Sequence, residues 1–190
     1  MNESVNGSQL DELIKGCIRH DRASQKLLYK QFYGYSMSIC MRYTRNREDA
    51  YEVLNDAFMK VFTRIEQYDF KYAFKSWLRR ILINTSIDCI KKEQKNRNQL
   101  GIEDLNLPSH AISQDHKQHH EELLMLVQQL SPAYRSVFNL FVMDGYDHKD
   151  IARMLGISVG TSKSNLAKAR QRLKELLFKI DKDEYARYAG

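Results

Sequence analysis

The sequence predicts an all-α fold of two small helical domains, a four-helix N-terminal domain and a C-terminal helix-turn-helix domain, joined by a flexible linker. Apolar residues recur at intervals of three and four over most of the chain, which is the spacing of one helix face. The 190 residues include only 2 prolines and 8 glycines, which favours helices over turns. Between residues 93 and 119 this periodicity gives way to polar residues, as is typical of a linker.

The first domain is predicted at residues 8–92. After a short opening helix, Asp21 is a suitable N-cap for a second helix that ends near Tyr43. The third helix follows Asn46 and has the clearest apolar face, and a fourth begins near Phe74. The apolar face of the third helix consists of Ala50, Val53, Leu54, Ala57, Phe58, Val61, Phe62 and Ile65.

The second domain is predicted at residues 120–180 and ends in a helix-turn-helix. Ser131 and Pro132 supply the cap and first-turn proline of a helix that precedes the motif. Gly156 allows a tight turn, and Ser158 is placed to cap the next helix. That helix suits the major groove of DNA because it is strongly basic, although an ordinary solvated helix pair is the alternative. Its cations are Lys163, Lys168, Arg170, Arg172 and Lys174.

Composition narrows the class of protein. The net charge of +6 and the pI near 9.1 favour an anionic partner. Cys17, Cys40 and Cys89 are scattered and form no C-x-x-C pair, so we expect small buried thiols in a reducing compartment rather than a disulfide framework. No segment has the basic and apolar pattern of a signal peptide or the length of a membrane span. We therefore expect a soluble, cytoplasmic protein.

Aromatic and basic residues alternate in residues 68–92, a mixture typical of surfaces that bind single-stranded nucleic acid. Tyr68, Phe70 and Tyr72 precede the fourth helix and are the better candidates for stacking on bases. By contrast, Phe74 and Trp77 fit the apolar stripe and are predicted core residues. The cations that follow, Arg79, Arg80, Lys91 and Lys92, are equally compatible with a solvated helix face.

Three motifs in order resemble those of the extracytoplasmic-function sigma factors, the compact class of bacterial RNA polymerase specificity subunits. Residues 46–62 read NREDAYEVLNDAFMKVF and are similar to the family's NREDAEDLVQEVFLKLW. Residues 155–173 read LGISVGTSKSNLAKARQRL and are similar to LGISEGTVKSRLHRARKKL. The family pattern F-x-x-WL-x-x-I-x-x-N-x-x-x-D is matched by Phe74, Trp77, Leu78, Ile81, Asn84 and Asp88.

The resemblance implies three sets of functional residues. Binding to the clamp coiled coil of core polymerase falls to Asp49, Glu52, Asn55, Asp56 and Phe58, whose acids are otherwise explained as a solvated face near a helix N-terminus. Recognition and melting of the minus-ten element fall to Tyr68, Phe70, Lys71, Tyr72, Lys75, Arg79, Arg80 and Asn84. Recognition of the minus-thirty-five element falls to Ser158, Thr161, Lys163, Ser164, Asn165, Lys168, Arg170 and Arg172, the last two as phosphate contacts.

The implied partners are core RNA polymerase, through its clamp coiled coil and flap tip, promoter DNA and an anti-sigma factor. Two residues depart from the family pattern: Ser162 replaces an inward-facing valine, and Asn165 stands where arginine is frequent. Asn prefers adenine and Arg prefers guanine, so the second departure bears on the promoter sequence. The linker at 93–119 takes the place of the middle domain of housekeeping sigma factors.

The main alternative is a two-domain helix-turn-helix regulator with a sensing or dimerisation domain. Residues 46–92 argue against it, because a sensor has no need of an acidic clamp helix followed by an aromatic and basic segment. We expect no enzyme activity, no cofactor, no metal and no membrane insertion. The histidines of the linker region, His110, His116, His119 and His120, are interpreted as a chance cluster rather than a metal site.

Overall fold

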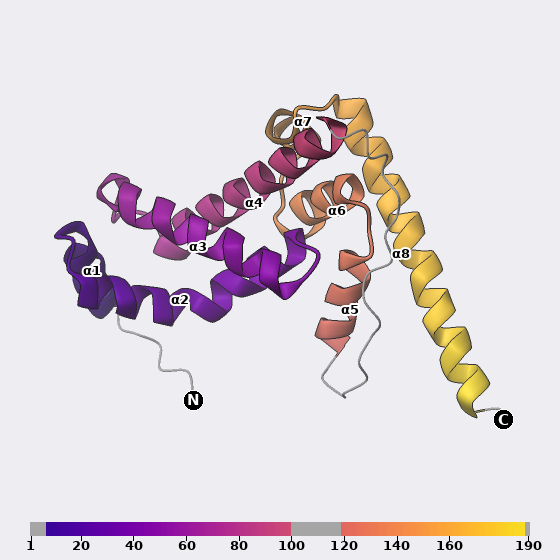
Figure 1. Ribbon diagram of the computed structural model, residues 1–190, viewed down its shortest axis with the longest axis horizontal. Helices are drawn as coiled ribbons and strands as arrows, with labels where there is room; N and C mark the ends of the chain where they lie inside the picture. The colour runs from indigo at the N-terminus through magenta and orange to yellow at the C-terminus, as the bar shows by residue number, and fades with distance from the viewer. Residues whose placement is uncertain (1–6, 100–118, 189–190) are drawn as a thin grey trace. The chain divides into compact units, whose positions relative to one another are not determined.

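The computed structural model describes residues 7–99 and 119–188, and every regular element in these ranges is helical (Figure 1). This confirms the predicted fold class. The elements are α1 (Gly7–Ile18), α2 (Arg22–Tyr43), α3 (Arg47–Arg64), η1 (Ile65–Gln67), α4 (Phe74–Gln99), α5 (His119–Gln128), α6 (Pro132–Phe138), η2 (Asn139–Met143), α7 (His148–Leu155) and α8 (Val159–Tyr188).

The chain divides into two compact units. Of the described residues, the first unit contains 7–40 and 48–86, and the second contains 41–47, 87–99 and 119–188. The first unit has an aliphatic core in which Leu28, Leu54 and Leu82 are each fully buried. At Gly16, an added Cβ would lie 2.1 Å from the Ser24 hydroxyl, so the approach of α1 to α2 requires a glycine.

The start of α2 in the first unit has the N-cap that the sequence predicts, Asp21. The Asp21 carboxylate accepts hydrogen bonds from the backbone N–H groups of Ser24 at 2.9 Å and Ala23 at 3.3 Å. The Ser24 hydroxyl also donates to this carboxylate, and that bond, followed by the two backbone bonds, lowers the pKa of Asp21. Of the predicted buried thiols, Cys17 and Cys40 are buried and Cys89 is half-buried. Burial raises the pKa of Cys17 to about 11.

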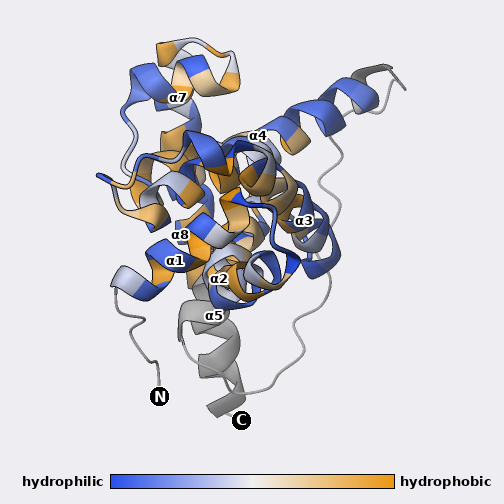
Figure 2. Cartoon of the chain, turned by 90° about the vertical axis from the view of Figure 1, so that its left-hand side faces the viewer, coloured by the Kyte–Doolittle hydropathy of each residue, from blue (hydrophilic) through white to orange (hydrophobic). Residues whose placement is uncertain are grey.

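The fourth helix is longer than the sequence predicts. The apolar periodicity suggests a linker from residue 93, whereas α4 continues to Gln99. Residues 91–99 contain no glycine or proline, and all but Asn96 and Asn98 are Lys, Glu, Gln or Arg, which have high helix propensity, so the helix persists without an apolar face. In Figure 2 the coloured part of this end of α4 is mostly hydrophilic. The rest of the predicted linker, residues 100–118, lies outside the described residues.

The second unit holds the predicted helix-turn-helix. Ser131 caps α6 by accepting from the Tyr134 N–H at 3.5 Å, and the helix then widens into the π-helical η2. Asp147 caps α7 through the Asp150 N–H at 2.8 Å, and that backbone bond lowers the pKa of Asp147. Gly156 ends α7 with φ of 70°, in the left-handed region that favours glycine. The turn chemistry expected from the sequence is confirmed.

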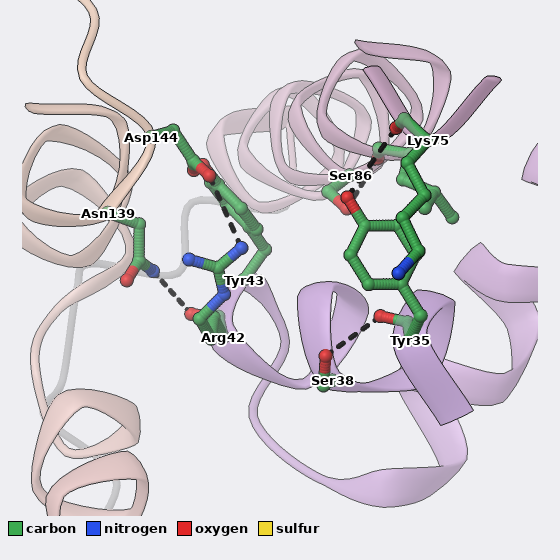
Figure 3. A network of polar contacts seen from close by, with 9 residues as sticks. Tyr35, Ser38, Arg42, Tyr43, Lys75, Ser86, Asn139 and Asp144 are labelled. Atoms are coloured by element: carbon green, nitrogen blue, oxygen red, sulfur yellow. Dashed lines mark hydrogen bonds and ion pairs between the residues drawn. The ribbon is translucent and has the colours of Figure 1, made fainter. Parts of the chain in front are cut away.

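Buried polar groups connect the end of α2 to η2 inside the second unit. Asp144 accepts a hydrogen bond from the Tyr43 hydroxyl, and an ion pair joins it to the Arg42 guanidinium at 3.2 Å (Figure 3). The Asn139 amide donates to the Arg42 carbonyl at 2.5 Å. Burial, with the Asp144 charge added, raises the pKa of Tyr43 well above its ordinary value.

Candidate functional site

One side of α3 is acidic and exposed, and the other side is apolar and buried. Its buried side includes Val53, Leu54 and Ala57, while Glu52 and Asp56 are exposed. Asn55 is also exposed, and Asp49 is half-buried. Phe58, predicted to bind polymerase, is only 2% exposed and packs against Tyr29 with ring centroids 4.7 Å apart. Phe58 therefore supports this surface from beneath.

Tyrosines of α2 extend the α3 surface, and sequence reasoning did not identify them. The Tyr29 hydroxyl donates to the Asn55 side-chain oxygen at 3.3 Å, and the hydroxyls of Tyr33 and Tyr51 lie 2.6 Å apart. Met59, four residues after Asn55 on α3, is 65% exposed. The surface thus combines exposed apolar area with negative charge, which suits a basic protein partner better than DNA. No signal local to α2 indicates which of its tyrosines meet α3.

The loop before α4 separates its three aromatics into one buried ring and two exposed rings. Tyr68 is 7% exposed, and its hydroxyl donates to the Tyr72 carbonyl at 2.5 Å. Burial raises the pKa of Tyr68. Phe70 is 43% exposed and Tyr72 is 69% exposed. The prediction that all three rings are available for stacking therefore needs correction at Tyr68, which packs against Phe70, Phe74 and Trp77.

The start of α4 carries the predicted cations on its surface. Lys71, Lys75 and Arg80 are exposed, as is Asn84, whereas Arg79 is half-buried. The Lys75 ammonium lies 5.5 Å from the centroid of the Tyr35 ring, and the Tyr35 hydroxyl approaches the Lys75 carbonyl at 3.5 Å (Figure 3). Phe74 is 3% exposed and Trp77 is half-buried, in agreement with their predicted core positions. The exposed aromatics and cations of this segment belong to the same unit.

The basic helix α8 begins with the predicted cap. The Thr161 N–H donates to the Ser158 hydroxyl at 2.9 Å, and the two hydroxyls lie 2.8 Å apart. Asn165 is half-buried, and Arg170 is exposed with its guanidinium 6.0 Å from the Phe141 ring. The other predicted DNA contacts of this helix are also exposed: Lys163, Ser164, Lys168 and Arg172.

Ser162, the departure from the family pattern, is fully buried, and its hydroxyl lies 2.9 Å from Nδ1 of His148. The polar residue therefore has a partner in α7. In the described part of the chain, no group of three or more His, Cys, Asp and Glu side chains is placed to hold a metal ion. The side chains of the linker histidines lie outside the described residues. No described helix has both the length and the apolar character needed to cross a bilayer.

Family models match both units. A Sigma-70 region 2 model matches residues 28–96, and a Sigma-70 region 4 model matches residues 120–173. The ECF RNA polymerase sigma factor SigM of Mycobacterium tuberculosis is 29% identical over 170 residues, which is 87% of this chain and 83% of SigM. SigW of Bacillus subtilis is 28% identical over 151 residues, 73% of this chain and 81% of SigW. The chain belongs to the ECF class of the sigma-70 family.

A solved structure shares the sigma-factor fold. RpoE from Bartonella quintana, in complex with the anti-sigma factor NepR, has a TM-score of 0.52 and 23% identity. The match covers 80% of this chain and 95% of RpoE. Within the sigma-70 framework, region 2 contains α3, the aromatic loop and the start of α4, and region 4 contains the helix-turn-helix.

Proposed function

We propose that this sigma factor binds core RNA polymerase through α3, opens promoter DNA at the minus-ten element with the loop before α4, and reads the minus-thirty-five element with α8. The observation that carries the proposal is the pair of exposed faces with opposite charge, acidic on α3 and basic on α8. A regulator that binds only DNA has no use for the first. The protein catalyses no reaction itself, because polymerase forms the phosphodiester bonds.

The clamp coiled coil of core polymerase is the proposed receptor for α3. Asp49, Glu52, Asn55 and Asp56 supply charge and hydrogen-bonding groups to it. Phe58 acts indirectly, because it is buried under Tyr29. Since exposed charges steer association and the apolar centre of an interface supplies most affinity, Met59 and Tyr51 belong in the same interface.

Phe70 and Tyr72 are the proposed stacking platforms for bases of the minus-ten element. Their exposed rings are held by the buried Tyr68, which contacts one ring and the backbone of the other. Lys71, Lys75, Arg79, Arg80 and Asn84 surround them with groups suited to phosphates and base edges. Separating stacked bases from their partners in the duplex is what distinguishes a sigma factor from a repressor.

The minus-thirty-five element is the proposed ligand of α8. Ser158, Thr161, Lys163, Ser164 and Asn165 lie at the start of the helix, where such motifs present side chains to base edges. Further along, Lys168, Arg170 and Arg172 are positioned for phosphates. We also propose the flap tip of polymerase as a partner of the second unit and an anti-sigma factor as a regulator, since RpoE was solved with NepR.

Run-off transcription with purified core polymerase on genomic fragments tests the function. We expect discrete transcripts that require the chain, from fragments that share two elements at a fixed spacing. The Phe70→Ala/Tyr72→Ala variant should bind core polymerase but give little transcript from linear DNA. If the chain binds these fragments yet supports no transcript and does not bind core polymerase, it acts as a helix-turn-helix regulator instead.

A further inference from the structure

The helices α7 and α8 pack against each other, and among the described residues one side-chain hydrogen bond joins them. Ser162 of α8 is 0% exposed, and its hydroxyl lies 2.9 Å from Nδ1 of His148, the first residue of α7. Either atom can be the donor, depending on the imidazole tautomer. A buried hydroxyl without a partner is costly, so this contact favours the one arrangement of the two helices in which it forms.

The His148 ring is also held by η2. It stacks on Phe141 with ring centroids 4.6 Å apart and an angle of 22° between the planes. The Arg170 guanidinium of α8 lies 6.0 Å from the centroid of the same Phe141 ring. The imidazole therefore lies at the junction of η2, α7 and α8, and its position is fixed by stacking as well as by the hydrogen bond.

We infer that His148 is a positioning residue for promoter recognition, because its hydrogen bond to Ser162 fixes the rotation of α8 about its own axis. Ser162 lies between Thr161 and Lys163, two proposed base-reading residues, and adjacent side chains on a helix project about 100° apart. A rotation of about 20° would move a side-chain tip roughly 6 Å from the axis by about 2 Å. A displacement of that size breaks a hydrogen bond to a base edge.

A hydrogen bond is better suited to this task than an apolar contact. Its strength depends steeply on distance and angle, whereas the hydrophobic effect has no directional preference. The inference rests on the proposed role of α8 in reading DNA. It assigns to His148 an effect on sequence preference, not contact with DNA.

The test is minus-thirty-five preference, measured with the full chain bound to core polymerase on a promoter from the run-off experiment and on its single-base variants. We expect His148→Leu and Ser162→Ala to reduce the discrimination between the best and mismatched elements about tenfold, or 1.4 kcal/mol. The salt dependence should not change, because the phosphate contacts remain. His148→Asn keeps a polar atom near the place of Nδ1 and should restore most of the preference.

Ser136→Ala is the matched control. Ser136 is also buried, at 1% exposure, but its hydroxyl donates within its own helix, to the Pro132 carbonyl at 2.7 Å. Its loss should leave minus-thirty-five preference unchanged. Should His148→Leu fail to fold, the two serine variants decide the matter.

Three results are distinguishable from the expected one. Uniform weakening on every element, or full preference in both His148→Leu and Ser162→Ala, would overturn the positioning role while leaving α8 as the reading helix. A parent protein that shows no minus-thirty-five preference would instead contradict the proposed function of α8.

Discussion

The two units of this sigma factor bury different kinds of side chain. Among the described residues, the first unit buries aliphatic and aromatic side chains, and its buried polar side chains are the small hydroxyls of Ser36, Thr85 and Ser86. The second unit buries an arginine, an amide and a carboxylate, those of Arg135, Asn139 and Asp144. Packing in the first unit is therefore set mainly by shape and periodicity, and in the second also by hydrogen bonds between buried polar groups, such as those that Asp144 accepts and Asn139 donates.

The largest expected effect of this difference is on stability. Asp144→Leu removes the acceptor of the Tyr43 hydroxyl and the partner of the Arg42 guanidinium, so it should lower the free energy of unfolding by about 3–5 kcal/mol. In the first unit, Leu54→Met is a volume-conserving change at a fully buried position. It should lower the free energy of unfolding by less than about 1.5 kcal/mol. Urea denaturation followed by circular dichroism measures both. Equal costs would remove the contrast between the two interiors.

In the first unit, the functional rings lie on an apolar support and should be removable without loss of the fold. Phe70→Ala together with Tyr72→Ala should depress open-complex formation by roughly 1–3 kcal/mol per stacked base while core binding persists. Permanganate reactivity of melted thymines reports the opening. Phe178→Ala, which removes a ring that is 57% exposed on α8, is the control. Normal opening by the double variant would show that the loop rings do not stack on bases.

In the second unit, residues of α8 that contact bases and residues that contact phosphates should respond differently to substitution. Asn165→Ala should cost about 1–3 kcal/mol on the preferred promoter and relax the preference at one base pair. Arg170→Ala should weaken all sequences alike and reduce the salt slope by about one. Binding of minus-thirty-five variants at two salt concentrations distinguishes the behaviours. The reverse pattern would mean that the helix docks in another register.

The smallest effect concerns alkaline pH and the buried Tyr43. The phenol is neutral in both states below about pH 10. Between that value and the higher pKa of the folded protein, only the unfolded chain loses the proton, so stability should fall as pH rises. Tyr43→Phe should flatten this decline between about pH 10 and 11, measured by denaturation at each pH. An unchanged slope would show that Tyr43 does not titrate differently in the two states.

Local patterns in the sequence predict most of the helical architecture. The apolar stripe of α3, the caps Asp21 and Ser158 and the turn at Gly156 depend on neighbours within a few positions, so they can be read without a structure. The sequence pattern places the end of α4 too early, because a wholly polar stretch of helix has no periodic signal. The sign of the charge on α3 and α8 was likewise readable from the sequence.

Side-chain burial at the site was less predictable, since it depends on contacts between elements. Periodicity placed Phe58 on the apolar stripe, and the resemblance placed it at the polymerase surface; its 2% exposure favours the first interpretation. Tyr68 lies in a loop, where exposure is the usual expectation, yet three neighbouring rings cover it. The partnership of His148 with Ser162 joins residues that no sequence period relates.

The central claim is that α3 binds polymerase and α8 binds DNA. Its most direct test compares the affinity for core polymerase of two variants, each with one charge reversed, one in each unit. Both Asp56 and Arg172 are exposed, so Asp56→Arg and Arg172→Glu should fold normally. Measured by fluorescence anisotropy of the labelled chain, Asp56→Arg should raise the Kd for core polymerase about tenfold or more, while Arg172→Glu leaves it near the parent value. Parent-like affinity in Asp56→Arg, or equal losses in both variants, would contradict the account.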